Sequence, residues 1–336
     1  MPISPRLAPW PKPIAPRHRR AARWLNRVGG VLLALVGACG GLTTVTRAET
    51  AAATGKVPRE AAAQRFDHGL LWRIDRPGAP GQAPSHLYGT VHVDDARASA
   101  FGPSVRRALS KSRVFVPELL PDADSAQAFA AATRAEPGQT LADLAGSDDF
   151  ERIAERLRTR YGVPRATTAQ LKPWAAYVYL SQPARPMGEI VDAALIRLAQ
   201  QQGLPVQPLE TVEQQIAAMD AVPVDSQLAL LAALARDHDA AMAEVDQLVE
   251  LYLAQDLAGL RRLEESATRD DPRLQRPMAD FIEQILDRRN ARMLTTLRPQ
   301  LEAGGAFTAV GALHLTGEQG LLARLVRAGW RVRRVD

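Results

Sequence analysis

The chain has 336 residues, of which 46% are hydrophobic and 24% are charged, and it contains a single cysteine. This composition supports a globular core and excludes a low-complexity disordered chain, a collagen-like repeat and a disulfide scaffold. Residues 1–48 hold eight of the 42 cationic side chains and no acidic one, which leaves 34 cations against 37 acids in the rest of the chain. The basic character therefore belongs to the leader, and the sequence does not predict a nucleic-acid-binding protein.

Residues 1–48 have the pattern of a secretory signal peptide. Seven cations precede an uncharged apolar segment at 28–42, which is shorter than the roughly 20 residues of a membrane-spanning helix. Cys39 ends the sequence VGAC, which resembles a bacterial lipobox, in which the cysteine carries a lipid anchor. In the alternative interpretation, Cys39 is a small residue of a segment that is cleaved off near Ala48. Both interpretations predict export, to the periplasm or to a membrane-attached position, with residues 49–66 as a flexible linker.

The chain that follows opens with a predicted hairpin, a helix and a strand. The apolar runs 69–75 and 86–93 are rich in strand-forming residues, and a segment of proline and glycine separates them, which is typical of two strands joined by a turn. Residues 103–112 begin with proline and show helical spacing of apolar side chains. The run 113–119 predicts a short buried strand.

The middle of the chain, about 122–300, is predicted to be a large helical insertion. The expected helices are 148–161, 172–181, 189–202, 226–253 and 280–301. Residues 124–135 are ambiguous between helix and loop, and 204–209 are expected to form one more strand.

The last part of the chain repeats the order of the first. Residues 306–313 predict a buried strand, 317–328 an amphipathic helix, and 330–335 an edge strand of alternating polarity. We therefore predict one α/β domain, residues 67–336, with a central, mostly parallel sheet. It starts with a β-hairpin and contains two units of strand, Gly-x-x-His, helix and strand, each suited to a right-handed crossover.

The candidate functional residues follow predicted strands. The sequence contains no HExxH, GxSxG, P-loop or helix-opening GxGxxG motif. His92 and His314 each stand three residues after a glycine at the end of a strand, and Glu118 ends another strand. Because ligands bind beyond the carboxyl ends of strands in open α/β sheets, these side chains are candidate ligands of a divalent ion, with Glu210 as a fourth. Taken singly, a histidine at the end of a strand is more often a structural residue, and Glu118 could be an ordinary solvated acid.

Several blocks of sequence resemble a known family. They are LLWRID, HLYGTVHV, VFVPELL, LKPWAAYVYL, VDAALIRLAQQQGLPVQPLETVEQQ, DRRNARM and VGALHLTGEQGLLARLVRAGWRVRRV, in this order. Together they resemble the TraB/GumN family, also called TraB/PrgY/GumN or Tiki-like, over about residues 69–335. One departure is Pro117 before Glu118, which is tolerated at a strand end.

The resemblance implies a fold related to the erythromycin-esterase (EreA) and ChaN-like haem-binding groups. For the Tiki members it also implies metal-dependent peptidase activity with Mn or Co. The family's motif histidines fall on His92 and His314, and its motif glutamate falls on Glu118. The other matching positions, to which the resemblance assigns no firm role, are Asp192, Glu210, Gln215, Arg289 and Asn290.

The leading hypothesis is an exported metal-dependent hydrolase that cleaves peptides or proteins. His92 and His314 would bind Mn, Co or Zn, and Glu118 would be a third ligand or the general base. Arg289 is a candidate for stabilising an oxyanion or binding a substrate carboxylate; its structural alternative is a helix salt bridge with Asp287 or Glu283.

Two alternatives remain open at the level of sequence. One is a non-catalytic protein that binds haem or a peptide in the same cleft, and the other is a metal-free, esterase-like enzyme that uses a histidine with a carboxylate. Trp72 and Tyr88 are expected to pack in the core. His68, His86 and His238 are expected to be structural or solvated.

Overall fold

The computed structural model describes residues 66–184, 188–269 and 271–335. The signal peptide region, Cys39 and the predicted linker up to residue 65 lie outside the described residues. Phe66 is buried and packs edge-to-face on Trp72, with ring centroids 5.3 Å apart, so this last residue of the predicted linker belongs to the folded domain. Trp72 and Tyr88 are both buried, which confirms their predicted packing role.

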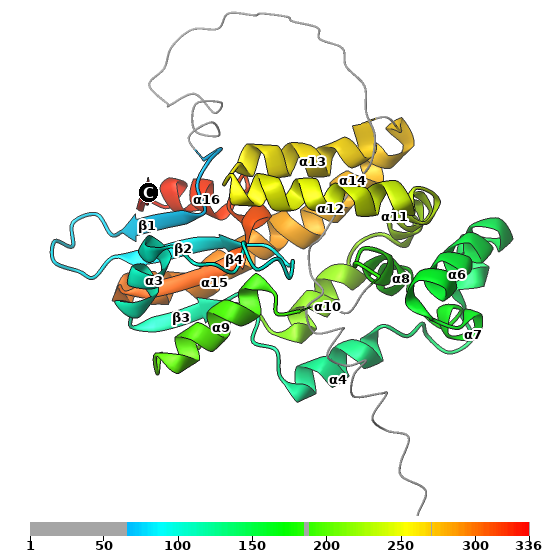
Figure 1. The fold of residues 1–336 in the computed structure, drawn as a ribbon, viewed down its shortest axis with the longest axis horizontal. Helices are drawn as coiled ribbons and strands as arrows, with labels where there is room; N and C mark the ends of the chain where they lie inside the picture. Colours follow the sequence, from blue (N-terminus) through cyan, green and yellow to red (C-terminus); the bar gives the residue numbers. More distant parts are fainter. Residues whose placement is uncertain (1–65, 185–187, 270, 336) are drawn as a thin grey trace, which may run out of the picture.

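Five described strands form one mixed, mostly parallel sheet (Figure 1). They are β1 (Leu71–Asp75), β2 (Ser85–Thr90), β3 (Val114–Pro117), β4 (Ala306–Gly311) and β5 (Arg331–Arg334). Their order is β3-β4-β2-β1-β5; β4 is parallel to both neighbours, and β1 is antiparallel to both of its own. The predicted α/β class, mostly parallel sheet and opening hairpin are confirmed, whereas the relation to the erythromycin-esterase and ChaN-like folds stays a prediction.

The burial of the strands follows from their sequences. Every residue of β3 and β4 is buried, as expected for apolar runs covered on both faces. In β5 only Val332 is buried between exposed arginines, and this strand lies at the edge of the sheet. Charged side chains on an edge strand discourage further strand pairing.

Two short helices follow strands that end near the predicted histidines. Helix α3 (Pro103–Ser110) follows β2 and begins with proline, whose fixed φ suits the first helical position. Helix α16 (Leu321–Arg327) follows β4 and starts later than predicted. The reason is a turn in which the Gly320 N–H donates to the Gly317 carbonyl, with Gly317 at φ +80°, outside the helical region.

The helical insertion lies between β3 and β4, as predicted. Its α-helices are α4 (Ala123–Ala132), α5 (Leu141–Ala145), α6 (Ser147–Tyr161), α7 (Arg165–Thr168), α8 (Pro173–Leu180), α9 (Val191–Gln201), α10 (Val212–Asp220), α11 (Val224–Arg236), α12 (His238–Leu253), α13 (Leu257–Arg269), α14 (Gln275–Ile282) and α15 (Arg288–Ala303). A 3₁₀ turn, Pro272–Leu274, precedes α14, and a π-helical segment, Glu283–Asp287, joins α14 to α15. In Figure 1 the sheet lies at one end of the molecule and helices α6 and α7 lie at the other.

Two predictions within the insertion are wrong. The single helix expected at 226–253 is broken into α11 and α12 at Asp237, whose backbone dihedral angles are not helical. Aspartate is favoured at the position before a helix starts. The strand expected at 204–209 is reduced to one bridge, between Val206 and Phe115. Pro205 and Pro208 have no N–H groups to donate to a ladder, which explains the reduction.

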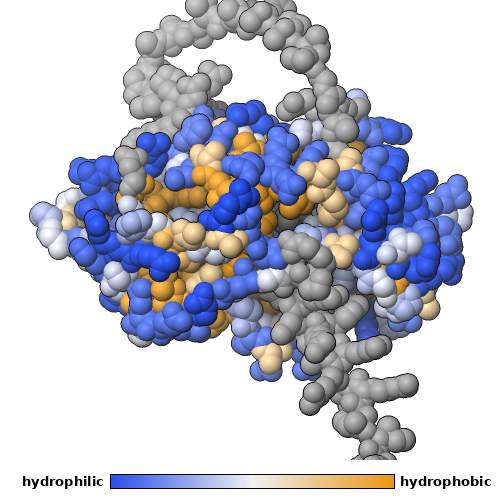
Figure 2. Space-filling model, viewed as in Figure 1, coloured by the Kyte–Doolittle hydropathy of each residue, from blue (hydrophilic) through white to orange (hydrophobic). Residues whose placement is uncertain are grey.

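The buried apolar side chains form two clusters. We call the first the sheet core; its members include Leu87, Phe115, Leu195, Leu297 and Phe307. We call the second the helical core; its members include Phe150, Leu157, Leu180, Leu231 and Ile285. On the face shown in Figure 2, hydrophobic colour gathers over the half that contains the sheet. Among the described residues Val224 is the one large hydrophobic side chain that is mostly exposed, and partly buried side chains such as Leu198 and Leu294 pack at the border of the sheet core.

Among the described helices, only the pair α10–α11 comes near the length and hydrophobicity of a membrane span. None of them is long and apolar enough by itself, and the pair α10–α11, bent by 90°, meets the criteria of length and composition only when both helices are counted together.

Candidate functional site

Glu118 is the centre of a buried polar cluster at the end of β3. Its side chain accepts from Arg289 Nη2 at 2.5 Å, from Gln215 Nε2 at 3.3 Å and from the Gly311 backbone N–H at 3.0 Å. Burial by itself would raise the pKa of Glu118. The charge of Arg289, with further contributions from the two imidazoles and the Gly311 N–H, outweighs burial and lowers this pKa to about 2, so the carboxylate is ionised at neutral pH.

Arg289 joins two buried carboxylates. It is fully buried on α15, directly after the π-helical segment, and donates through Nε and Nη2 to Glu210 Oε2 at 2.9 and 2.6 Å. Burial lowers the pKa of Arg289, but Glu118 and Glu210 raise it more strongly, so its charge is retained. The predicted helix salt bridge with Asp287 or Glu283 is wrong, because Glu283 pairs instead with Arg288, which faces solvent.

Glu210 is held in place by its backbone and by the start of α10. Its N–H donates to the Glu118 carbonyl at 3.0 Å. The next residue, Thr211, caps α10 in a reciprocal capping box with Gln214. Burial raises the pKa of Glu210 despite the neighbouring charge of Arg289. Its Oε1 atom has no hydrogen-bond partner and lies 3.9 Å from a nitrogen of the half-exposed Arg292.

His314 lies beside Glu118 in a 3₁₀ turn that directly follows β4. Its Nδ1 is 2.7 Å from Asn290 Oδ1, whereas its Nε2 has no hydrogen-bond partner and lies 3.9 Å from Glu118 Oε2. The residue is fully buried. Burial is the main cause that lowers the pKa of His314 to about 3, so the imidazole is neutral at neutral pH.

His92 lies two residues beyond the end of β2, beside an acidic residue of α9. Its Nδ1 is 3.3 Å from Asp192 Oδ2, and Thr90 Oγ1 donates to Asp192 Oδ1 at 2.7 Å. The side chains of His92 and Asp192 are 11% and 17% exposed, so this pair reaches the solvent while His314 does not. Burial raises the pKa of Asp192, although His92 and Thr90 oppose this effect. Neither ring nitrogen of His92 has a hydrogen-bond partner.

The glycines of the two Gly-x-x-His sequences have different surroundings. A Cβ atom at Gly89 would lie 2.8 Å from Leu315 Cδ1 and 3.2 Å from Ala312 Cα, so this glycine allows the turn that carries His314 to pack on β2. This is the close backbone approach expected of a strand glycine. A Cβ atom at Gly311 would meet only His314 Cδ2 at 3.6 Å and Glu118 Oε2 at 3.8 Å, which are ordinary contacts.

The sequence-predicted residues therefore gather in two adjoining groups. One contains Glu118, Glu210, Arg289 and His314, and the other pairs His92 with Asp192. The charge of His92 affects the pKa of both Glu118 and His314, which links the groups electrostatically. Among the described contacts, none joins Glu210 directly to either histidine.

The cluster has an excess of negative charge and several buried polar atoms without hydrogen-bond partners. The cluster contains three carboxylates, those of Glu118, Asp192 and Glu210, and one fully buried guanidinium, which pairs with Glu118 and Glu210; Arg292 is half-exposed nearby. The buried atoms without hydrogen-bond partners are Nδ1 and Nε2 of His92, Nε2 of His314, Oδ2 of Asp192 and Oε1 of Glu210. Buried polar atoms without partners are costly unless a proton, a cation or water satisfies them. Within the part of the chain that the structure describes, however, no three His, Cys, Asp or Glu side chains converge as closely as a metal centre requires.

Some supporting contacts were not predicted. Thr90 holds Asp192, the Gln319 carbonyl accepts from Asn290 Nδ2 at 3.0 Å, and Tyr252 Oη donates to the Gly89 carbonyl at 2.9 Å. A signal existed only for Thr90, which lies within the first Gly-x-x-His sequence. The other two contacts join residues 29 and 163 positions apart, where a single sequence carries no pairing information.

The other histidines of the described chain lie apart from this cluster. His238 is buried and contacts Tyr161 Oη at 2.9 Å, and His68 is exposed and lies 3.8 Å from Asp256. His86 is half-buried on β2, beside Phe307.

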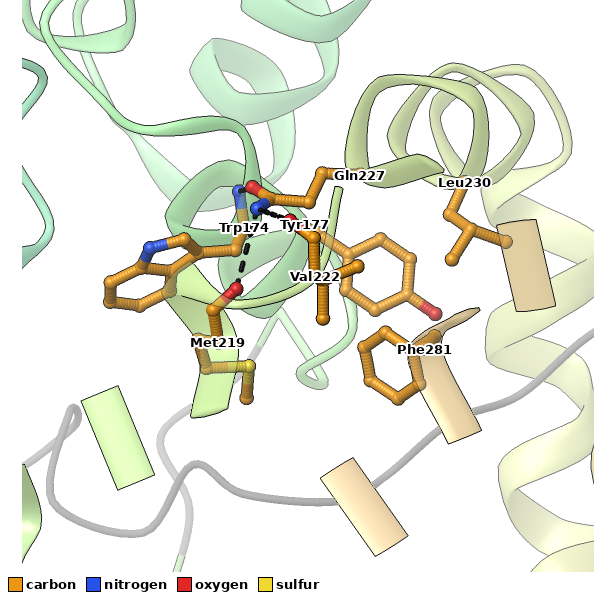
Figure 3. A pocket seen from close by; sticks show the side chains of 7 residues that line it. All are labelled: Trp174, Tyr177, Met219, Val222, Gln227, Leu230 and Phe281. Carbon is orange, nitrogen blue, oxygen red and sulfur yellow. Dashed lines mark hydrogen bonds between the residues drawn. The ribbon is translucent and has the colours of Figure 1, made fainter. Parts of the chain in front are cut away.

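A small cavity in the helical core is not a substrate site (Figure 3). The centre of a water molecule could move within only about 10 Å³ of this cavity, so it has room for about one water molecule. The one amide in its wall, that of Gln227, is satisfied by the Trp174 N–H and by the Met219 and Val222 carbonyls. The cavity is lined by Trp174, Tyr177, Met219, Val222, Gln227, Leu230 and Phe281.

Comparison with known proteins gave one match. The family model of the TraB/PrgY/gumN family matches residues 70–334, which is nearly all of the described chain. No curated protein and no solved structure matches the chain.

Proposed function

The chain belongs to the TraB/PrgY/gumN family, and from this premise we propose that it is a metal-dependent hydrolase that cleaves peptide bonds. The observation that carries the proposal is the gap between His314 Nε2 and Glu118 Oε2. The two atoms face each other at 3.9 Å, and Nε2 has no hydrogen-bond partner. The peptidase activity is the one implied by the resemblance to the Tiki members.

The donor chemistry of the cluster fits a divalent ion. Imidazole nitrogens and carboxylate oxygens are the ligands that Zn, Mn and Co use in proteins. His314 Nε2 and Glu118 Oε2 would hold the ion, and His92, whose ring nitrogens are both unpaired, would supply a third donor after a side-chain movement. The buried negative charge in excess of Arg289 favours a cation. Glu210 is a weaker candidate ligand, because one of its oxygens is bound by Arg289.

The residues of the cluster have separate roles in the proposed mechanism. A divalent ion lowers the pKa of a bound water from 15.7 toward about 7 and so supplies hydroxide near neutral pH. Glu118, with a pKa of about 2, is too weak a base to remove a proton efficiently at neutral pH, so its charge serves for binding. Asp192 faces Nδ1 of His92 at 3.3 Å and would orient this ring for binding through its buried Nε2. Arg289 neutralises two carboxylates and, being fully buried, does not reach a substrate.

A metal-free hydrolase is the second candidate. The observation that favours it is the chain of contacts from Thr90 through Asp192 to His92, which orients an imidazole without any ion. In this case His92 would act as the general base on water, and the buried groups around Glu118 would serve to shape the site.

Elemental analysis of the full chain, purified without chelator, tests the leading proposal. We expect near-stoichiometric Mn, Co or Zn in the wild type, and its loss in His314→Gln and Glu118→Gln. His68→Gln is the matched control, because this histidine is exposed and lies outside the cluster. Thermal unfolding of each variant separates the loss of the ion from the loss of the fold.

Three other outcomes contradict the proposal in whole or in part. If peptide hydrolysis persists after exhaustive chelation, the metal-free candidate is correct. If there is neither metal nor hydrolysis, but the protein binds haem with a Soret band that His92→Gln abolishes, it is a binding protein. If Glu118→Gln retains full hydrolysis, Glu118 has no part in the reaction.

A further inference from the structure

The two ring nitrogens of His314 have different partners. Nδ1 is 2.7 Å from Asn290 Oδ1, which is a normal hydrogen-bond distance, whereas Nε2 is 3.9 Å from Glu118 Oε2 and has no hydrogen-bond partner. A neutral imidazole carries one proton, on one nitrogen or the other. The nitrogen that carries it decides whether Nε2 offers a lone pair to the site.

The orientation of the Asn290 amide settles which nitrogen carries the proton. Asn290 Nδ2 donates to the Gln319 carbonyl at 3.0 Å, and a carbonyl can only accept, so the nitrogen end of the amide must face Gln319. The oxygen end then faces His314 Nδ1 and can itself only accept. The proton of His314 is therefore on Nδ1.

The Gln319 carbonyl is in turn held by a charged side chain. Arg324 Nε donates to it at 2.7 Å, and Arg324 Nη2 donates to the Asp287 carbonyl at 3.2 Å, at the end of the π-helical segment. Arg324 thus ties the start of α16 to the start of α15, between which the Asn290 amide is held.

The opposite tautomer would close the site. With its proton on Nε2, His314 would be attracted to the ionised Glu118, because hydrogen bonds to charged groups are stronger than those between neutral groups. The Nε2 proton would then occupy the gap where an ion or a transferred proton could bind. Asn290 opposes this attraction.

We propose that Asn290 is a positioning residue that keeps the proton of His314 on Nδ1 and so keeps the Nε2 lone pair free toward Glu118. The use of this lone pair in hydrolysis rests on the proposed function. The tautomer is a property of the resting protein and can be tested without any activity.

Nitrogen NMR of the full chain, labelled with ¹⁵N at histidine and treated with chelator, reads the tautomer directly. His314→Gln identifies the His314 signals. We expect a protonated Nδ1 and an unprotonated Nε2 in the wild type. Asn290→Leu, which has a similar volume but no acceptor, should move the proton to Nε2. Asn290→Asp, which keeps an acceptor, should restore Nδ1–H. Gln300→Leu removes an amide further along α15 and is the control. Its His314 signals should be the same as those of the wild type.

Metal affinity provides a second readout. Loss of a group that orients a metal-binding histidine typically costs about 10- to 100-fold in affinity, and we expect this loss in Asn290→Leu and a smaller one in Asn290→Asp.

Two results would overturn the inference: a wild-type His314 with its proton on Nε2, or an Asn290→Leu protein that keeps it on Nδ1. If Asn290→Leu does not fold, the wild-type spectrum alone decides. A protonated Nδ1 in a protein that neither binds metal nor hydrolyses peptides would leave the role of Asn290 standing and remove the proposed function.

Discussion

Gly89 and Gly311 hold equivalent positions in the two Gly-x-x-His sequences, yet a methyl group at each has a different consequence. At Gly89 it would collide with Leu315 and with the backbone of Ala312. We expect Gly89→Ala to lower the free energy of unfolding by about 1–3 kcal/mol, as other overpacked sites do.

At Gly311 the methyl group would fit, but it would lie against His314 and Glu118. Gly311→Ala should unfold in urea within about 0.5 kcal/mol of the wild type, as substitutions without a steric conflict do, and bind metal more weakly. If both variants lost the same stability, Gly311 would be a packing residue and not a border of the site.

Arg289 is expected to be the most sensitive buried cation. Its replacement in Arg289→Met leaves Glu118 and Glu210 buried without their shared partner, which typically costs about 3–5 kcal/mol. Arg292→Met is the matched control, because Arg292 is 44% exposed and lies 3.9 Å from Glu210, so we expect a change below about 1 kcal/mol. Denaturant unfolding of both variants checks the difference. Equal effects would mean that the buried ion pairs do not stabilise the fold.

The sequence predicted the residues of this cluster better than their contacts. The strand-end rule identified Glu118 and His314 without knowledge of the fold, because it depends only on local order. The partners of Arg289 could not be predicted, since Glu210 and Glu118 are 79 and 171 positions away and a helix salt bridge is the nearer option. The family resemblance selected Asn290 but gave no role for it.

At the level of elements, helix α13 contains a carboxyl group that the site does not use. Glu264 is buried, and its Oε1 has no hydrogen-bond partner. Burial is the main cause that raises its pKa to about 8, with Glu265 adding to the rise and Arg261 opposing it. Glu264 is therefore protonated in the folded protein at neutral pH.

This protonation makes stability depend on pH. In the unfolded chain Glu264 ionises near its ordinary pKa of 4.5, whereas in the folded protein it keeps its proton up to about pH 8. The unfolded state thus binds fewer protons between these values, and the free energy of unfolding should fall as the pH rises, by up to about 1.4 kcal/mol per pH unit.

Glu264→Gln should remove this contribution, whereas Glu265→Gln, at a neighbouring carboxylate with a 47% exposed side chain, should retain most of it, because burial is the main cause of the raised pKa. Urea unfolding at several values between pH 5 and 8.5 measures the slopes. Parallel curves for the wild type and Glu264→Gln would show that Glu264 does not titrate as stated.

Helices and strands were predictable where local periodicity is strong. The strands β1 to β4 and helices α3, α6 and α8 lie close to their predicted ranges, because their apolar spacing and proline or glycine boundaries are local signals. Helices α10 and α13 were not predicted. The π-helical segment before α15 was also missed, because it depends on packing between helices rather than on residue type.

On the scale of the whole molecule, the leader remains to be tested. We expect export to remove residues before Cys39 or near Ala48. Expression of the full-length gene followed by membrane fractionation and mass measurement distinguishes the two. A lipidated protein would be found in the membrane fraction, and Cys39→Ser would release it. Cleavage near Ala48 would instead leave both the wild type and Cys39→Ser in the soluble fraction. An intact chain retained in the cytoplasm would contradict export.

The overall architecture was predictable because its two ends share one order of elements. The sheet could be expected from the four apolar runs and the edge strand, and the insertion from the helical periodicity between them. The position of β4 between β3 and β2 could not be predicted, because strand order depends on long-range packing. The division of the apolar side chains into the sheet core and the helical core was not predicted either.

The central position of β4 has a consequence for how the chain is made. Strands β2 and β3 are synthesised early, but each pairs with β4, which begins at Ala306, far along the chain from the ends of β2 at Thr90 and of β3 at Pro117. The sheet therefore cannot close on a ribosome-bound chain until nearly all of it has emerged, and pairing over such long separations is slow. Late closure of the sheet would be compatible with transport across a membrane as an unfolded chain. It also means that a chain terminated before Ala306 would expose two unpaired strand edges, which are sites of aggregation.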